Sequence, residues 1–179
     1  MTAPRTGSRT APRTSARVVL LDDAGAVLLL CGSDPAITDR PAPRWWFTVG
    51  GRVRPGEPLA EAAARELAEE TGLRVPPAGL IGPVWRRDSA FWFNGAEIAS
   101  EEFYFVHRTR RFAPATAGRT SLELRYIHAH RWCDPAAIAA LARAGQRVYP
   151  EELADLLTEA GQLADRPPGD LRAQPRPIR

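Results

Sequence analysis

The sequence contains no lysine, one methionine, three histidines and two cysteines. All 24 basic residues are therefore arginine, which we attribute to coding bias rather than to chemistry. Cys31 and Cys133 lie far apart, with no second cysteine or histidine at ligand spacing, so neither a zinc site nor a disulfide framework is indicated. We expect both cysteines to be small buried groups, and a disulfide between them is the less favoured alternative.

Long hydrophobic runs are also absent. No stretch approaches the roughly 20 apolar residues that a membrane span requires, and the N-terminus lacks the apolar core of a secretory signal. The sequence shows no internal repeat. We therefore expect a cytoplasmic protein with no membrane partner.

The two ends of the chain differ in composition from the rest. Residues 1–17 consist mainly of Thr, Pro, Arg, Ser and Ala without an acid, and closely spaced prolines and arginines follow Asp165. We expect disordered tails at 1–15 and 163–179 around one domain at 16–162. These ends carry the basic excess behind the net charge of +3, so the segment between them is net acidic. Specific binding of nucleic acid is therefore not expected.

Alternating apolar runs and turn residues predict most of the secondary structure. Two runs at 18–21 and 26–30 flank a turn and predict a hairpin, and "RWWFTVGG" predicts an aromatic strand. Helices are expected from Pro58 to Thr71, after Asp134-Pro135, and at 150–160. Further strands are expected at 80–85, 91–93, 102–107 and 124–132, with a tight turn at Asn94-Gly95. Strands around a central helix, with helices at the end, predict a mixed α/β sandwich.

The first expected helix is unusually acidic along one side. Glu66, Glu69 and Glu70 fall within an arc of about 100° on a helical wheel, beside a stripe that packs. A solvated face of salt bridges around Arg65 would explain such a pattern. A glycine pair and Glu57 precede the cluster at fixed distances, however, and clustered oxygen ligands are what a hard divalent cation selects. The context therefore favours a magnesium site.

The segment from Gly51 to Leu73 resembles the Nudix box. That motif is Gly, five residues, Glu, seven residues, then Arg-Glu-apolar-x-Glu-Glu-x-Gly-apolar. Its specified positions are occupied here by Gly51, Glu57, Arg65, Glu66, Leu67, Glu69, Glu70, Gly72 and Leu73. One departure is Val49, because the residue before the glycine pair is often proline in that family.

The resemblance implies the Nudix fold, an α/β/α sandwich with a mixed β-sheet, and a hydrolase that uses Mg²⁺ or Mn²⁺. By position in the motif, Glu66, Glu69 and Glu70 would be metal ligands, with the Gly51 carbonyl beside them and Glu57 assisting directly or through water. Arg65 would orient the glutamates. Catalysis would involve Arg65, Glu66 and Glu69. Family members also recruit a glutamate from outside the box, and one of the pair Glu101-Glu102, at the start of the strand "EEFYFV", is the expected further metal ligand or general base, with Glu102 preferred.

The expected partner is a small nucleotide in which a nucleoside diphosphate is linked to another group. Trp46, Arg52 and Trp92 are the predicted substrate-binding residues. The preferred substrate is a modified nucleoside triphosphate cleaved to the monophosphate and pyrophosphate, ahead of a dinucleoside polyphosphate, ADP-ribose or a nucleotide sugar. Two alternative functions come from other functional classes. One is a non-catalytic nucleotide sensor, and the other is an isomerase of allylic diphosphates. A homodimer is left open.

Overall fold

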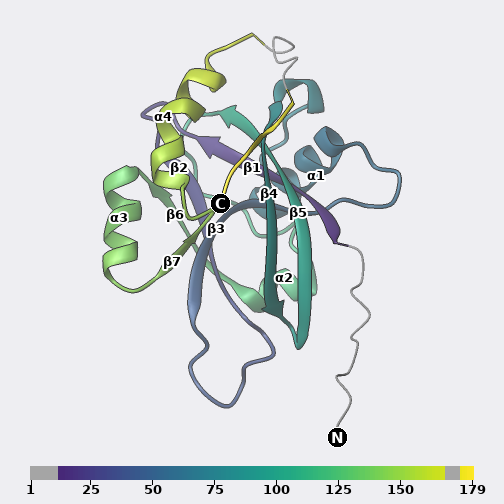
Figure 1. Cartoon of the computed structure of the whole chain (residues 1–179), viewed down its shortest axis with the longest axis vertical. Coiled ribbons are helices and arrows are strands. Elements are labelled where there is room, and N and C mark those ends of the chain that lie inside the picture. Colours follow the sequence, from purple (N-terminus) through teal and green to yellow (C-terminus); the bar gives the residue numbers. More distant parts are fainter. Residues whose placement is uncertain (1–11, 168–173) are drawn as a thin grey trace, which may run out of the picture.

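A mixed eight-stranded sheet forms the centre of the computed structural model, which describes residues 12–167 and 174–179 (Figure 1). The strand order is β6-β2-β3-β1-β5-β4-β8, with β7 beside β3. Three strand pairs are parallel, namely β1 with β5, β3 with β7 and β4 with β8. The strands are β1 (Arg13–Leu21), β2 (Val27–Ser33), β3 (Arg44–Arg52), β4 (Ile81–Phe93), β5 (Ala96–Arg108), β6 (Ile127–Cys133), β7 (Arg147–Tyr149) and β8 (Arg176–Pro177).

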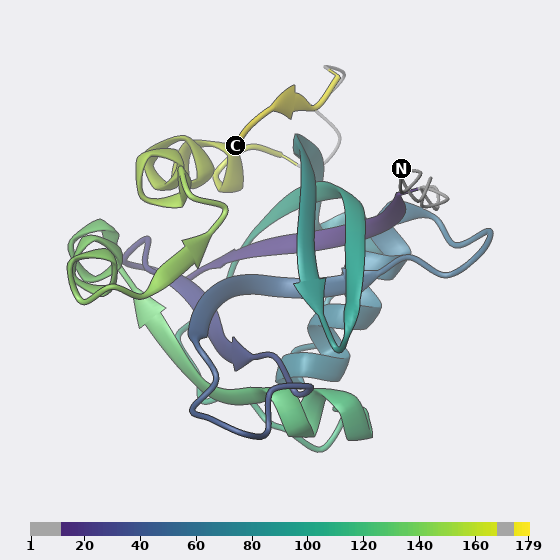
Figure 2. The ribbon, with the colours of Figure 1, turned by 60° about the horizontal axis from the view of Figure 1, so that its bottom comes forward.

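Helices cover both faces of this sheet. Helix α1 lies on one face, and α3 and α4 lie on the other (Figures 1 and 2). The helices are α1 (Leu59–Thr71), α2 (Ser121–Tyr126), α3 (Pro135–Arg143) and α4 (Leu153–Ala164), with a 3₁₀ turn, η1, at Pro77–Gly79. No helix among the described residues has the length and apolar character needed to cross a membrane. The arrangement confirms the predicted α/β/α sandwich with a mixed sheet.

Alternation along β1 explains why the sheet carries a core on each face. Val18 and Leu20 pack on the α1 side, whereas Val19 and Leu21 pack against α4 and its neighbours. All four side chains are fully buried. Successive residues of a strand point to opposite faces, so one strand contributes to both cores.

Local sequence signals correctly predicted the ends of two helices and one turn between strands. Helix α1 stops at Gly72, whose φ of 79° is left-handed and whose amide donates to the Ala68 carbonyl. The Asp134 side chain accepts from the Ala137 amide and caps α3. The turn at Asn94 and Gly95 joins β4 to β5 with φ angles of 50° and 79°. Both cysteines are free and buried, as expected.

Two strand predictions differ from the structure in their bounds. The runs at 80–85 and 91–93 form one strand, β4, because the polar residues between them pair in continuous register with β5. The first part of the strand expected at 124–132 is helical, because Thr120 and Glu123 form a capping box that starts α2.

The folded part of the chain extends beyond the expected limits of 16 and 162. Strand β1 begins at Arg13 and pairs with β5 from that residue onward. Helix α4 continues to Ala164, and Arg176 then pairs with Trp85 in β4 while Ile178 packs against the core. The expected tails are therefore partly ordered. Residues 1–11 and 168–173, also expected to be disordered, lie outside the described residues.

Candidate active site

Three carboxylates from two helices meet at the C-terminal half of α1. Glu66 and Glu70 lie one turn apart on α1, and Glu123 comes from α2. One carboxylate oxygen from each of them lies within 4.8 Å of the others. Glu66 is 6% exposed and Glu70 is fully buried. We call Glu66, Glu70 and Glu123 the acid cluster.

Glu70 has an oxygen whose hydrogen-bonding capacity is unused. Its Oε2 accepts a 2.8 Å hydrogen bond from the Gly50 amide, but its buried Oε1 has no partner among the described residues. Burial raises the pKa of Glu70 to about 8, and the nearby Glu66 carboxylate adds to this effect. A buried carboxylate oxygen without a partner is costly, so this oxygen fits a site that receives a cation.

The glycine pair lets the backbone approach the acid cluster closely. Gly50 has a φ of 132°, and a Cβ there would lie 2.2 Å from the Ala16 carbonyl oxygen. A Cβ at Gly51 would lie 2.6 Å from Oε2 of Glu66. Only glycine fits at position 50, whereas a side chain at position 51 would displace the Glu66 carboxylate, beside which the Gly51 backbone lies.

Arg65 holds three of the predicted glutamates. Its Nη1 donates to Glu66 at 2.7 Å and to Glu69 at 3.0 Å, while its Nε and Nη2 bind both oxygens of Glu57 at 2.7 and 2.9 Å. This pairing lowers the pKa of Glu57 to about 2. Among the described residues, Glu57 and Glu69 face Arg65 and do not belong to the acid cluster.

Glu123 was not among the residues predicted from the sequence. Its Oε2 accepts hydrogen bonds from the Thr120 amide and hydroxyl, and the Glu123 amide donates to the Thr120 hydroxyl. The pattern Thr-x-x-Glu is visible in the sequence and marks a helix N-terminus. This signal was not used, because the residues that follow were predicted to form a strand.

A cavity of about 590 Å³ opens beside Glu66 and Glu123. Aromatic side chains from β3, β4, β7 and α2 line it, among them Trp45, Phe47, Phe91, Trp92, Tyr126 and Tyr149. Five arginines also line it, namely Arg13, Arg17, Arg52, Arg87 and Arg147. Aromatic faces suit a planar ring, and arginines suit phosphate oxygens. The cavity therefore has the chemistry to receive a nucleotide.

Two of the three predicted substrate-binding residues line this cavity. Arg52 and Trp92 do so, and Trp92 is 69% exposed. Trp46 does not line it, because its side chain packs in the core beneath α3 and α4 and its Nε1 donates to Gln146 at 2.6 Å. Side-chain alternation along β3 instead turns Trp45 toward the cavity.

Glu102 lies in the cavity wall and outside the acid cluster, where a further metal ligand or base was predicted. It pairs with Arg17 at 3.0 Å and Arg87 at 2.9 Å, and accepts from the Tyr104 hydroxyl at 2.8 Å. Burial works to raise the pKa of Glu102, but the two arginines outweigh it and the pKa is lowered. Both oxygens are thus occupied by cationic or hydroxyl donors.

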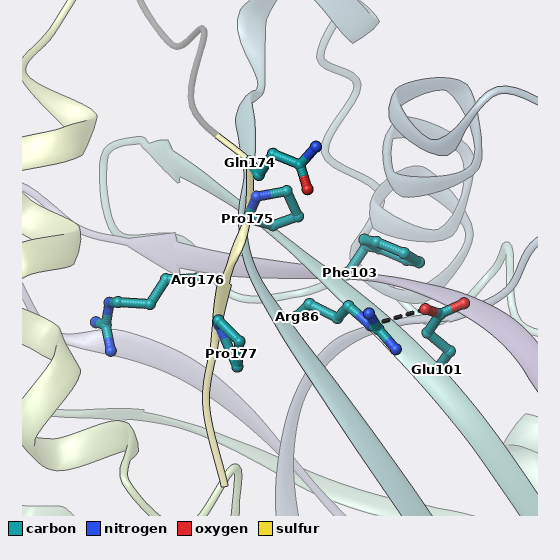
Figure 3. Close-up of a pocket in the computed structure, with 7 residues that line it drawn as sticks. All are labelled: Arg86, Glu101, Phe103, Gln174, Pro175, Arg176 and Pro177. Atoms are coloured by element: carbon teal, nitrogen blue, oxygen red, sulfur yellow. Dashed lines mark ion pairs between the residues drawn. The ribbon is translucent and has the colours of Figure 1, made fainter.

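A second cavity lies elsewhere, between β5 and the C-terminal segment that contains β8 (Figure 3). Glu101, the one carboxylate among its described residues, pairs with Arg86 at 2.7 Å, and Phe103 and the chain from Gln174 to Pro177 complete its wall. The described part of this groove has no cluster of acids. We therefore place the candidate active site at the cavity beside Glu66 and Glu123.

Comparison with known proteins agrees with the motif and the fold. The NUDIX domain model matches residues 11–153. A putative 8-oxo-dGTP diphosphatase from Bacillus subtilis (strain 168) is 39% identical over 65 residues, which cover 36% of this chain and 38% of the relative. In three curated relatives that it matches, the chain spans between 10% and 38% of their length.

Solved structures share the fold at low sequence identity. The MutT protein from Methanosarcina mazei Go1 has a TM-score of 0.56 and 20% identity, covering 89% of this chain and 100% of that one. The dihydroneopterin triphosphate pyrophosphohydrolase of E. coli has a TM-score of 0.57 and 21% identity, covering 82% and 96%. With the family model matching most of its length, this chain belongs to the NUDIX domain family.

Proposed function

We propose that this chain is a pyrophosphohydrolase that depends on a divalent metal and acts on nucleotides. The observation that carries the proposal is the acid cluster, in which a buried Glu70 oxygen has no partner among the described residues. The cluster adjoins a cavity with aromatic and arginine walls. Such a site suits a substrate with a planar base and a bridged diphosphate.

Glu66, Glu70 and Glu123 would hold Mg²⁺ or Mn²⁺, with the Gly51 carbonyl beside them. An all-oxygen donor set with several carboxylates is what these hard cations select. When bound, the metal would lower the pKa of the attacking water and stabilise negative charge on the phosphate oxygens. Glu57 and Glu69 would support the site through Arg65.

The protein's own residues would orient the reactants. Arg65 holds Glu66 and Glu69 in place through hydrogen bonds. One of these two carboxylates would act as the general base and accept the proton of the attacking water. Arg52 and Arg87 line the cavity and supply donors for phosphate oxygens. The water oxygen forms a bond to phosphorus, and the bridging oxygen leaves with the other phosphate.

The proposed substrate is a nucleoside triphosphate with a modified base, cleaved to the monophosphate and pyrophosphate. The name of the B. subtilis relative, an 8-oxo-dGTP diphosphatase, supports this choice. Dinucleoside polyphosphates, ADP-ribose and nucleotide sugars belong in the same test as competing substrates.

Hydrolysis of a nucleotide panel in ¹⁸O-labelled water, with product analysis by mass spectrometry, tests the proposal. We expect turnover with Mg²⁺ or Mn²⁺, none in EDTA, and pyrophosphate among the products. Glu123→Gln should reduce turnover at least about 10-fold by removing a ligand charge. Glutamine serves equally well in the capping box, so α2 should remain intact.

The exposed Glu151→Gln is the matched control and should behave as wild type. If nucleotides bind but none is cleaved under any metal condition, the chain is a sensor and the hydrolase proposal fails.

Trp45→Ala is expected to raise KM about 10-fold with little change in kcat, because stacking on a base contributes roughly 1–3 kcal/mol. Trp46→Ala should instead lower the free energy of unfolding by about 3–5 kcal/mol, because it opens a hole in the core. Steady-state kinetics and urea unfolding distinguish the two variants. A raised KM for Trp46→Ala in a stably folded protein, with no change for Trp45→Ala, would reverse our assignment.

A further inference from the structure

Glu102 is the end of a continuous hydrogen-bond chain that leads to the acid cluster. Its Oε1 accepts from Nε and Nη2 of Arg17 at 3.3 and 3.0 Å, and its Oε2 accepts from Arg87 and the Tyr104 hydroxyl. Glu102 is 2% exposed. Two nitrogens of one guanidinium that donate to the same carboxylate oxygen restrict the orientation of the arginine as well as its position.

The third nitrogen of Arg17 points at the glycine pair. Its Nη1 donates to the Gly50 carbonyl oxygen at 2.8 Å. The Gly50 amide, on the other side of the same residue, donates to Oε2 of Glu70 at 2.8 Å. The chain therefore runs from Glu102 through Arg17 and Gly50 to Glu70.

The position of Gly50 matters because this residue has no side chain to hold it. Glycine readily adopts the φ of 132° found here, but it also adopts many other backbone conformations. Neighbouring groups must therefore hold this residue in place. The backbone of β1 lies against its α-carbon, and Arg17 and Glu70 bind its two polar groups. Loss of the Arg17 contact would let the peptide, and with it the Glu70 carboxylate, shift.

A buried ion pair contributes little net stability, because desolvation of both charges offsets their attraction. The pair of Glu102 and Arg17 therefore calls for a role besides stability. Groups that orient metal ligands typically change metal affinity or activity about 10- to 100-fold when they are mutated.

We propose that Glu102 is a positioning residue, which acts through Arg17 and Gly50 to fix the Glu70 carboxylate within the acid cluster. This inference rests on the proposed function, in which Glu70 is a metal ligand. It replaces the expected role of Glu102 as a ligand or base. Arg87 binds the same carboxylate and lines the cavity, so the chain also joins the substrate-facing wall to the metal site.

The test compares Glu102→Gln, Arg17→Gln and the double variant with Glu101→Gln as control. Glu101 is the adjacent residue on β5, but it pairs with Arg86 on the opposite face. Calorimetry with Mn²⁺ in the absence of substrate gives the metal affinity. Amide exchange of Gly50, followed by NMR in the metal-free protein, reports the middle of the chain directly.

We expect each single variant to weaken Mn²⁺ affinity about 10- to 100-fold. The double variant should lose no more than either single variant, because both act through one connection. Exchange of the Gly50 amide should accelerate at least about 10-fold in both, since its protection depends on local order. Glu101→Gln should match the wild type in both measurements.

Wild-type Mn²⁺ affinity and Gly50 exchange in folded Glu102→Gln and Arg17→Gln proteins would overturn this inference and leave the proposed function standing. Loss of Mn²⁺ binding in Glu102→Gln alone, with Arg17→Gln unaffected, would also overturn it by making Glu102 a ligand. Absence of Mn²⁺ uptake by the wild type would instead overturn the proposed function, while Gly50 exchange would still test the chain. If Glu102→Gln fails to fold, Arg17→Lys replaces it, because lysine keeps the charge but cannot form the two-point pair.

Discussion

Glu70→Gln is expected to weaken Mn²⁺ binding and turnover at least about 100-fold, because it removes a charged ligand from the acid cluster. Glutamine retains an acceptor for the Gly50 amide, so the local backbone should persist. Calorimetry with Mn²⁺ and steady-state kinetics measure the two losses. Glu61→Gln, an exposed change on the same helix, is the control and should leave both unchanged.

The same variant should change the pH dependence of stability in the metal-free protein. The folded-state pKa of Glu70, about 8, lies above its unfolded value near 4.3, so the wild-type carboxyl must bind a proton or bury its charge on folding. This cost is absent below about pH 4 and grows as the pH rises toward 8. Urea unfolding in EDTA should therefore find Glu70→Gln more stable than wild type at pH 8, with a difference that shrinks toward pH 5. A variant less stable than wild type at pH 8 would contradict this account.

Gly50→Ala is expected to lower the free energy of unfolding by at least about 3 kcal/mol, which combines backbone strain with a steric clash. The added Cβ would lie 2.2 Å from the Ala16 carbonyl and 2.7 Å from the Arg17 Cα, both in the backbone of β1. Neither atom can move away as a flexible side chain would. Urea unfolding measures the loss.

Gly56→Ala provides a matched comparison. Gly56 also has a positive φ, 76°, but a Cβ there would meet no atom within 4 Å. Its expected cost is about 1–2 kcal/mol, from the left-handed backbone alone. If the two substitutions lower the free energy of unfolding by the same amount, the close approach of β1 to the glycine pair does not affect stability.

Much of the candidate site could be read from one continuous segment. From Gly51 to Leu73 the motif spacing depends on a loop and a helix, and both are local structures. The start and stop of α1 follow from Pro58 and Gly72, and the helical period alone brings Glu66 and Glu70 to one side.

Long-range placement accounts for what sequence reasoning missed. Glu123 joins the acid cluster only because α2 folds back beside α1, far from it in sequence. Glu102 was expected to be a metal ligand or the general base, because the family recruits a glutamate from outside the box. The pairing of β1, β4 and β5 instead brings two arginines to it. Trp45 lines the cavity in place of the predicted Trp46 because of the face of β3 that borders it.

By itself, then, the sequence determined the acidic helix, the glycine pair, the turns and the alternation that give a two-faced sheet, because each depends on residues close together in the chain. Only the tertiary structure decided which third carboxylate completes the acid cluster, which aromatic faces the cavity and which partners Glu102 receives. Those outcomes depend on strand register and helix packing, where a shift of one residue turns a side chain to the other face.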